Sequence, residues 1–171
     1  MKRRILPVVL VLAMLCGCGG GQGEEKTLTP EERTQLYQTA IESARDAEMN
    51  EAVGIITDNT SETAPMILEL LDLEQEEMTA YAISVSLMNV KAYGIAAVFP
   101  AAGKEDDVRD GLADFIEIQK ESFREYLPDQ YDIARNARLE TLEDGTILMV
   151  MSEDQDAVFD SIRDAIEAQK I

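Results

Sequence analysis

Histidine and tryptophan are absent from the 171-residue sequence, and its only two cysteines are Cys16 and Cys18. Without histidine there is no imidazole to act as a general base, and without further thiols no His or Cys metal site can form. These absences exclude most familiar catalytic devices. We therefore expect a protein that is not an enzyme and that holds no metal or other cofactor.

Basic residues are also scarce, with 15 Lys and Arg against 34 Asp and Glu and a formal net charge of −19. Binding to nucleic acid and electrostatic attachment to anionic lipid both depend on Lys and Arg. We therefore expect no nucleic-acid partner. The acidity is compatible with solubility beside a negatively charged envelope and with loose binding of cations.

The apolar run near the N-terminus, Ile5 to Leu15, is too short to span a bilayer, because a transmembrane helix needs roughly 20 apolar residues. Basic residues at positions 2–4 precede the run, a layout typical of a secretory signal. The segment that follows resembles the bacterial lipobox, in which Leu stands three residues before the acylated Cys and a small residue directly precedes it. Cys18 fits that pattern, with Leu15 and Gly17 in place, whereas the bulky Leu15 directly precedes Cys16.

The lipobox predicts that residues 1–17 are a lipoprotein signal peptide and that Cys18 becomes the acylated first residue. Its diacylglyceryl group and palmitate would hold the protein on the outer, extracytoplasmic face of the cell membrane, since two acyl chains anchor stably where one does not. The alternative is an ordinary cleaved signal with incidental cysteines. Removal of residues 1–17 leaves 12 basic and 34 acidic residues, a formal charge of −22, and no free thiol.

Residues 18–28 form a glycine-rich, flexible tether, and residues 29–171 are expected to fold as a single α+β domain. Thr29 and Glu32 form the capping box of a first helix. Helical spacing of apolar residues predicts helices over about 30–47, from residue 65, over about 104–126 and over 155–169. Alternation predicts strands within 79–86 and 91–100 and a hairpin over 139–151 with an Asp-Gly turn.

From Met78 onward the predicted order is strand, strand, helix, and then the same again. This order predicts two layers: a four-stranded, largely antiparallel sheet with helices on one face, preceded by N-terminal helices. Residues 106–117 also align without gaps with residues 156–167, which suggests an internal repeat of about fifty residues. Convergence of two amphipathic helices with acidic outer faces explains the same similarity, and both interpretations remain open.

Acidic residues form one stripe on each of the two long predicted helices: Asp106, Asp110, Asp114, Glu117 and Glu121 on the first, and Asp156, Asp160, Asp164 and Glu167 on the last. Paired carboxylates can hold Ca²⁺ or act as acid and base. Straight stripes seldom converge on one ion, however, and no loop of the calcium-binding type occurs. We therefore interpret both stripes as solvated outer faces, and we assign Met149 and Met151 to the core.

Three segments, 82–98, 101–112 and 126–141, together resemble the domain-of-unknown-function family 4358, a group of Gram-positive lipoproteins without known activity. The positions that match are Tyr126, Leu127, Pro128, Gln130, Tyr131, Asn136 and Ala137. The resemblance covers roughly residues 66–165 and departs at Leu71-Asp72-Leu73, where the family often has Tyr-Gly-Ile. It implies attachment outside the membrane and brings no substrate or catalytic residue.

The connection between the third predicted helix and the third strand concentrates aromatic and amide groups, and loops often carry function. Its candidate binding residues are Tyr126, Asp129, Gln130, Tyr131 and Asn136. In the structural alternative, which we favour, the two tyrosines pack beneath the sheet edge and Asn136 caps or turns the chain.

Three functions from different classes follow from these observations. The first is a non-enzymatic lipoprotein that binds or scaffolds an envelope partner through the sheet face or the connection described above. The second is a lipoprotein that binds a cation or small ligand through its acidic stripes. The third is a carboxylate-based hydrolase, which requires a close pair of acids in a pocket.

Overall fold

The computed structural model describes residues 28–169, so the predicted signal peptide, Cys18 and most of the tether lie outside the described residues. The helices are α1 (Pro30–Ala44), α2 (Ala47–Ala52), α3 (Ala64–Leu70), the short 3₁₀ helix η1 (Gln75–Glu77), α4 (Glu105–Phe123), α5 (Pro128–Arg135) and α6 (Gln155–Glu167). The strands are β1 (Met78–Val85), β2 (Gly94–Pro100), β3 (Arg138–Thr141) and β4 (Ile147–Met151). Within residues 28–169, no helix combines the length and apolar character needed to cross a membrane.

The four strands form one sheet in the order β1-β2-β4-β3, and every neighbouring pair is antiparallel. In the centre of the sheet, Ala96 of β2 pairs with Ile83 of β1 and with Met149 of β4. The predicted Asp-Gly turn joins β3 to β4, and Gly145 adopts a φ of +89° that favours glycine. The predicted α+β class and antiparallel sheet are therefore confirmed.

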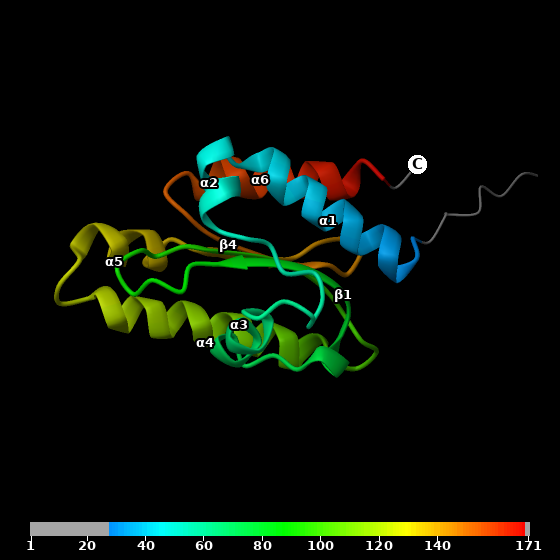
Figure 1. Cartoon of the computed structure of the whole chain (residues 1–171), viewed down its shortest axis with the longest axis horizontal. Coiled ribbons are helices and arrows are strands. Elements are labelled where there is room, and N and C mark those ends of the chain that lie inside the picture. The colour runs from blue at the N-terminus through cyan, green and yellow to red at the C-terminus, as the bar shows by residue number, and fades with distance from the viewer. Residues whose placement is uncertain (1–27, 170–171) are drawn as a thin grey trace, which may run out of the picture.

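Helices cover both faces of the sheet, so the predicted two-layer arrangement with helices on one face is wrong (Figure 1). One apolar cluster joins α3, α4 and α5 to the sheet, and a second cluster joins α1 and α6 to the opposite face. Strand β4 shows the reason, because all five of its residues are buried: Met149 belongs to the first cluster, Leu148 to the second. The small residues of β1 and β2, such as Ala82 and Ala97, are buried as well, beneath α1 and α6.

The positions of α4 and α6 bear on the suggested internal repeat. Leu112 and Phe115 of α4 pack on one face of the sheet, whereas Phe159 and Ile162 of α6 pack on the other. If the two strand-strand-helix units were equivalent, a twofold rotation about an axis perpendicular to the sheet would superpose β2 on β4. Such a rotation would leave α4 and α6 on the same face of the sheet. The opposite placement favours convergence of two acidic amphipathic helices over a duplicated unit.

Capping residues determine where the two N-terminal helices begin. Thr29 Oγ1 accepts a hydrogen bond from the Glu32 backbone N–H at 3.2 Å, and a Glu32 carboxylate oxygen accepts one from the Thr29 N–H at 2.9 Å. The predicted capping box is thus confirmed. The helix ends at Ala44 instead of Ala47 because Asp46 caps a new helix, α2, where its Oδ1 accepts from the Met49 N–H at 2.7 Å.

The segment after α4 differs from its prediction as a connection. Helix α4 ends at Phe123, and residues 128–135 form a further helix, α5. Pro128 occupies the first turn of α5, where its missing N–H removes no helical hydrogen bond. Residues 128–135 were predicted as part of a connection, although proline favours the first turn of a new helix.

A network of polar groups holds α1 to the β3–β4 turn. Tyr37 Oη lies 2.5 Å from Thr146 Oγ1, and Arg33 forms an ion pair with Asp144. Thr146 donates to Asp144 from both its N–H and its hydroxyl, each at 2.9 Å. The Arg33 guanidinium also lies over the Phe99 ring, 3.9 Å from its centroid. The network therefore joins three segments that lie far apart in the sequence.

Two pKa values shift within this network. Burial raises the pKa of Tyr37 to about 12. Burial also acts to raise the pKa of Asp144, but hydrogen bonds from Thr146 and the charge of Arg33 outweigh it, so this pKa lies below its ordinary value of 3.8. Asp144 is therefore more stable as a carboxylate in the folded protein than in the unfolded chain.

Helix α4 approaches the end of α3 closely at Gly111. A Cβ at this position would lie 2.6 Å from the Leu71 carbonyl oxygen, so the close contact requires glycine. The next residue after Leu71, Asp72, adopts a left-handed backbone with a φ of 52°. Glycine adopts this conformation most easily.

Candidate functional site

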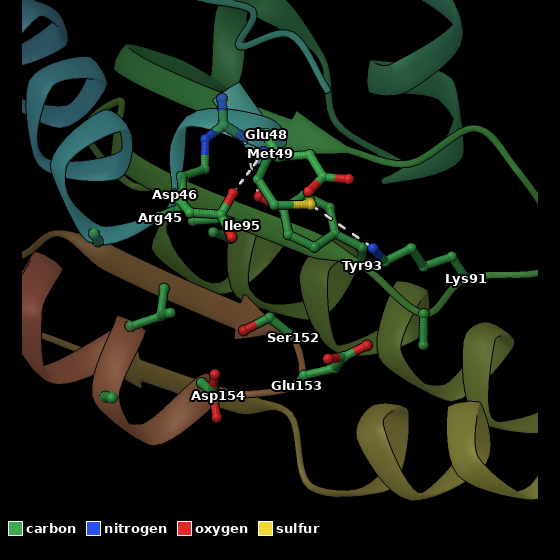
Figure 2. Close-up of a pocket in the computed structure, with 14 residues that line it drawn as sticks. Arg45, Asp46, Glu48, Met49, Lys91, Tyr93, Ile95, Ser152, Glu153 and Asp154 are labelled. Atoms are coloured by element: carbon green, nitrogen blue, oxygen red, sulfur yellow. Dashed lines mark hydrogen bonds between the residues drawn. The ribbon is translucent and has the colours of Figure 1, made fainter. Parts of the chain in front are cut away.

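A pocket of about 510 Å³ opens between α2, the segment that precedes β2 and the start of α6 (Figure 2). Its apolar wall is formed by Met49, Tyr93, Ile95 and Val158, together with alanines. Six charged residues also line it: Arg45, Asp46, Glu48, Lys91, Glu153 and Asp154. The pocket thus combines an apolar surface with charges of both signs.

Arg45 lies between α1 and α2 and is held by three neutral groups. Its Nη1 donates to Ser84 Oγ at 2.7 Å and to Tyr93 Oη at 3.0 Å, and its Nε donates to Asn50 Oδ1 at 2.6 Å. None of these acceptors is a carboxylate. The hydrogen bonds fix the guanidinium without neutralising it, so its positive charge remains at the pocket wall.

Lys91 is the second cation of the pocket, and its Nζ lies 3.7 Å from Met49 Sδ, a weak acceptor. Neither Lys91 nor Arg45 belongs to an ion pair among the described residues. Most other described cations do: Arg33, Lys104, Lys120, Arg124, Arg135, Arg138 and Arg163. Two unpaired cations in one pocket stand out in so acidic a chain.

Ser152 follows β4 and contributes a hydroxyl to the pocket lining. The residue is 9% exposed, and its Oγ has no hydrogen-bond partner in the structure. A buried hydroxyl without a partner costs about 1–3 kcal/mol. Figure 2 shows Ser152 between the labelled side chains of Ile95 and Glu153. A polar group that entered the pocket would satisfy this hydroxyl once the Ser152 side chain rotated toward it, because the Oγ itself is enclosed by protein atoms.

The four carboxylates of the pocket are exposed and spread around its opening. Asp46 is already engaged, because its Oδ1 caps α2. Across the described part of the chain, no three His, Cys, Asp or Glu side chains come close enough together to hold a metal ion. The charged residues of the pocket therefore suit organic groups of either sign better than a coordinated cation.

A second hollow, which we call the apolar groove, has a volume of about 440 Å³ and lies between α3, the segment that follows β1, and α4. It is lined by Met66, Glu69, Leu70, Ser86, Leu87, Met88, Asn89 and Gln119. Three of these side chains are apolar and strongly exposed: Met66 at 57%, Leu87 at 44% and Met88 at 63%. Grouped apolar side chains on a protein surface mark interaction sites, and methionine adapts its shape to different partners.

The five candidate binding residues of the sequence analysis do not converge, and none of them lines the pocket or the groove. Tyr126 is 86% exposed, so its predicted packing beneath the sheet edge is wrong. Asp129 is exposed in the first turn of α5. Tyr131 is partly buried against the apolar cluster that joins α3, α4 and α5 to the sheet, and the Arg135 guanidinium lies 5.8 Å from its ring centroid.

The two amides of the candidate set have structural roles. Asn136 ends α5, as predicted, and its Nδ2 donates to the Asp132 carbonyl at 2.9 Å. Gln130 Oε1 accepts a hydrogen bond at 2.8 Å from the N–H of Ala92, a residue that lines the pocket. Gln130 therefore positions the segment that carries Lys91 instead of contacting a ligand itself.

Three residues of the pocket were not predicted from the sequence, because they come from distant segments: Arg45, Lys91 and Ser152. One signal in the sequence points to Lys91: it is the only charged residue between Glu77 and Lys104. A charge isolated in a long neutral segment has no neighbour in sequence to pair with. The sequence contains no comparable signal for Ser152.

The acidic stripes lie on exposed surfaces, as predicted. All five acids of the α4 stripe are exposed. On α6, Arg163 pairs with Asp160 and Asp164, and Arg138 of β3 also pairs with Asp160. On α4, Lys120 pairs with Glu117 and Arg124 pairs with Glu121. Nearby cations thus neutralise part of each stripe. The interpretation as solvated faces is confirmed, although Asp160 and Glu167 of α6 are half-buried.

Comparison with known proteins gives one match. Residues 52–152 match the model of a family described as Domain of unknown function (DUF4358). No curated protein and no solved structure matches the chain. The matched segment begins and ends earlier than the expected 66–165. It contains all four strands with α3, α4 and α5, whereas α1 and α6, which cover the other face of the sheet, lie outside it.

Proposed function

Because the chain belongs to the family described as Domain of unknown function (DUF4358), which brings no activity, we propose its function from its own surface. The protein is a non-enzymatic lipoprotein that binds an envelope protein. Cys18 anchors it to the outer face of the cell membrane, and residues 18–28 connect the anchor to the domain. The observation that carries the proposal is the apolar groove.

The apolar groove supports binding to a protein partner for two reasons. Covering a fully exposed Leu or Met side chain is worth about 1.5–3 kcal/mol. Met66, Leu87 and Met88 are 57%, 44% and 63% exposed, so each supplies roughly half of this and together they supply a useful part of a binding energy. The chain that remains after removal of residues 1–17 has a formal charge of −22, and the one charged residue that lines the groove, Glu69, is acidic. A partner segment with apolar side chains flanked by Lys and Arg therefore fits this surface best.

The sheet faces, which the sequence analysis considered as binding surfaces, are both covered by helices (Figure 1). The exposed apolar groove takes their place in the proposal. The absence of histidine, together with two thiols that both precede residue 19, supports a non-enzymatic role.

Site-specific photo-cross-linking in cells tests the groove. A cross-linker at Asn89, which lines the groove, is expected to give one discrete adduct that disappears in Leu87→Glu, because a buried charge opposes the contact. The matched control is Tyr126→Glu, which adds the same charge at an exposed position outside the groove. An adduct that survives Leu87→Glu, or that is lost equally in the control, contradicts the proposal.

Metabolic labelling with radioactive palmitate tests the anchor. The full chain is expected to incorporate label in a bacterial host, Cys18→Ala to lose it, and Cys16→Ala to retain it, since Leu15 and Gly17 select Cys18. The Cys16 variant is the matched control, because it removes a thiol two residues away. Label that depends on Cys16, or that persists in Cys18→Ala, refutes the anchor.

A further inference from the structure

We infer that the pocket beside α2 binds a small zwitterion of the amino-acid or short-peptide type, which carries one carboxylate and one ammonium group. This site is separate from the apolar groove. The inference depends on the charges of the pocket, on the buried hydroxyl of Ser152 and on the apolar wall between them.

The cationic side of the pocket is formed by Lys91 and Arg45. Neither side chain has a carboxylate partner among residues 28–169, and Arg45 is held in place by neutral acceptors. A guanidinium or ammonium that is fixed but not neutralised attracts a carboxylate more strongly than one already in an ion pair. A ligand carboxylate therefore binds at Lys91, supported by the charge of Arg45.

The anionic side is formed by Glu153 and Asp154, which begin the turn into α6. Both are exposed, and neither belongs to an ion pair among the described residues. Figure 2 shows these two carboxylates on the wall opposite Arg45 and Lys91, with Ser152 between the two walls. A ligand ammonium at Glu153 and Asp154 and a carboxylate at Lys91 place the polar middle of the ligand near the Ser152 hydroxyl.

The charge balance of the pocket selects a zwitterion over simpler ions. Four carboxylates line the pocket against two cations, so phosphate or another multiply charged anion meets net repulsion. A simple cation would leave Lys91 and Arg45 without a partner and would be repelled by their positive charges. A molecule with both signs pairs with each wall, and its carbon atoms rest on Ile95 and Val158.

Isothermal titration calorimetry of the full chain in detergent, with three probes that differ in charge, tests this inference. The probes are dialanine, N-acetyl-dialanine, which lacks the ammonium, and dialanine amide, which lacks the carboxylate. Dialanine is expected to bind at least about tenfold more tightly than either blocked form, as the loss of one ion pair worth about 1.4 kcal/mol predicts. Equal binding of all three probes, or no binding of dialanine at millimolar concentration, overturns the inference.

Two variants identify the site within the same experiment. Lys91→Gln is expected to weaken dialanine binding about tenfold and to remove the preference over dialanine amide, whereas Lys91→Arg keeps that preference. Lys104→Gln is the matched control, because Lys104 is paired with Glu77 and Asp107. Unchanged dialanine binding in Lys91→Gln places the ligand elsewhere and overturns the assignment.

Ser152→Ala separates ligand binding from a purely structural role. Removal of a buried hydroxyl without a partner is expected to leave the melting temperature unchanged or raise it, while dialanine binding weakens. If the melting temperature falls and dialanine binding is unchanged, the hydroxyl is structural and the inference loses that contact. Leu87→Glu in the apolar groove is expected to leave dialanine binding unchanged, so this test is independent of the proposed partner surface.

Discussion

Phe159→Ala tests whether α6, which lies outside the family-matched residues, belongs to the same cooperative unit as the sheet. Phe159 is fully buried beneath the sheet face that α1 and α6 cover, and the Arg138 guanidinium lies 3.8 Å from its ring centroid. Truncation of a buried Phe to Ala costs about 3–5 kcal/mol, of which the Arg138 contact accounts for about 0.5–1 kcal/mol. Domains of this size typically have about 5–15 kcal/mol of stability, so the loss is a large fraction of the total.

The assay is urea and thermal unfolding of the acyl-free chain that begins at Gly19, followed by far-ultraviolet circular dichroism. Phe159→Ala is expected to lower the melting temperature by roughly 6–20 °C in one transition. Tyr126→Ala is the matched aromatic control, because Tyr126 is 86% exposed and its truncation is expected to change stability by less than about 0.5 kcal/mol. A loss below about 1 kcal/mol for Phe159→Ala, or a separate early transition, refutes one cooperative unit.

Three further predictions concern the backbone and the α1 network. Gly111→Ala is expected to destabilise the domain by about 1–3 kcal/mol in urea unfolding, because its Cβ would clash with the Leu71 carbonyl oxygen. An unchanged urea midpoint of unfolding would contradict the close contact between α4 and the end of α3. Asp72→Gly is expected to be neutral or to stabilise by up to about 1 kcal/mol, since φ is positive there; a clear loss would show that the Asp72 side chain matters more than the backbone. Asp144→Asn is expected to lower stability at pH 7. The lowered pKa means that the Asp144 carboxylate stabilises the fold above pH 3.8, and that this contribution is lost as the pH falls below 3.8 through the folded pKa, where the variant approaches the wild type. A stability difference that grows on acidification has the wrong sign.

Features that depend on neighbouring residues could be predicted from the sequence. The capping box of Thr29 and Glu32 and the Asp-Gly turn require only contacts within a few residues, and both occur as predicted. The strands followed from alternation, and their antiparallel pairing from short connections. Local chemistry was therefore sufficient for the elements and for the α+β class.

Features that depend on contacts between distant segments could not be predicted. In the sequence, Ala82 and Ala97 are equally compatible with a solvent-facing side of a strand and with a side covered by a helix. The structure shows that they are buried under α1 and α6. The pocket joins Arg45, Lys91 and Ser152 from three segments, and no spacing in the sequence relates them. Only the packing of α2, the segment before β2 and the start of α6 brings these side chains together.

The contact between α1 and α6 has a consequence for synthesis of the chain. These two helices pack side by side on one sheet face (Figure 1), although 110 residues separate the end of α1 at Ala44 from the start of α6 at Gln155. At about 5–20 residues per second, a ribosome completes α1 roughly 5–20 s before α6 begins. Throughout that interval the apolar side of α1, with Tyr37 and Ile41, lacks its neighbour. A nascent chain at this stage is expected to need a chaperone that holds it, or a delayed release. A chain truncated before residue 155 would leave the apolar side of α1 permanently exposed.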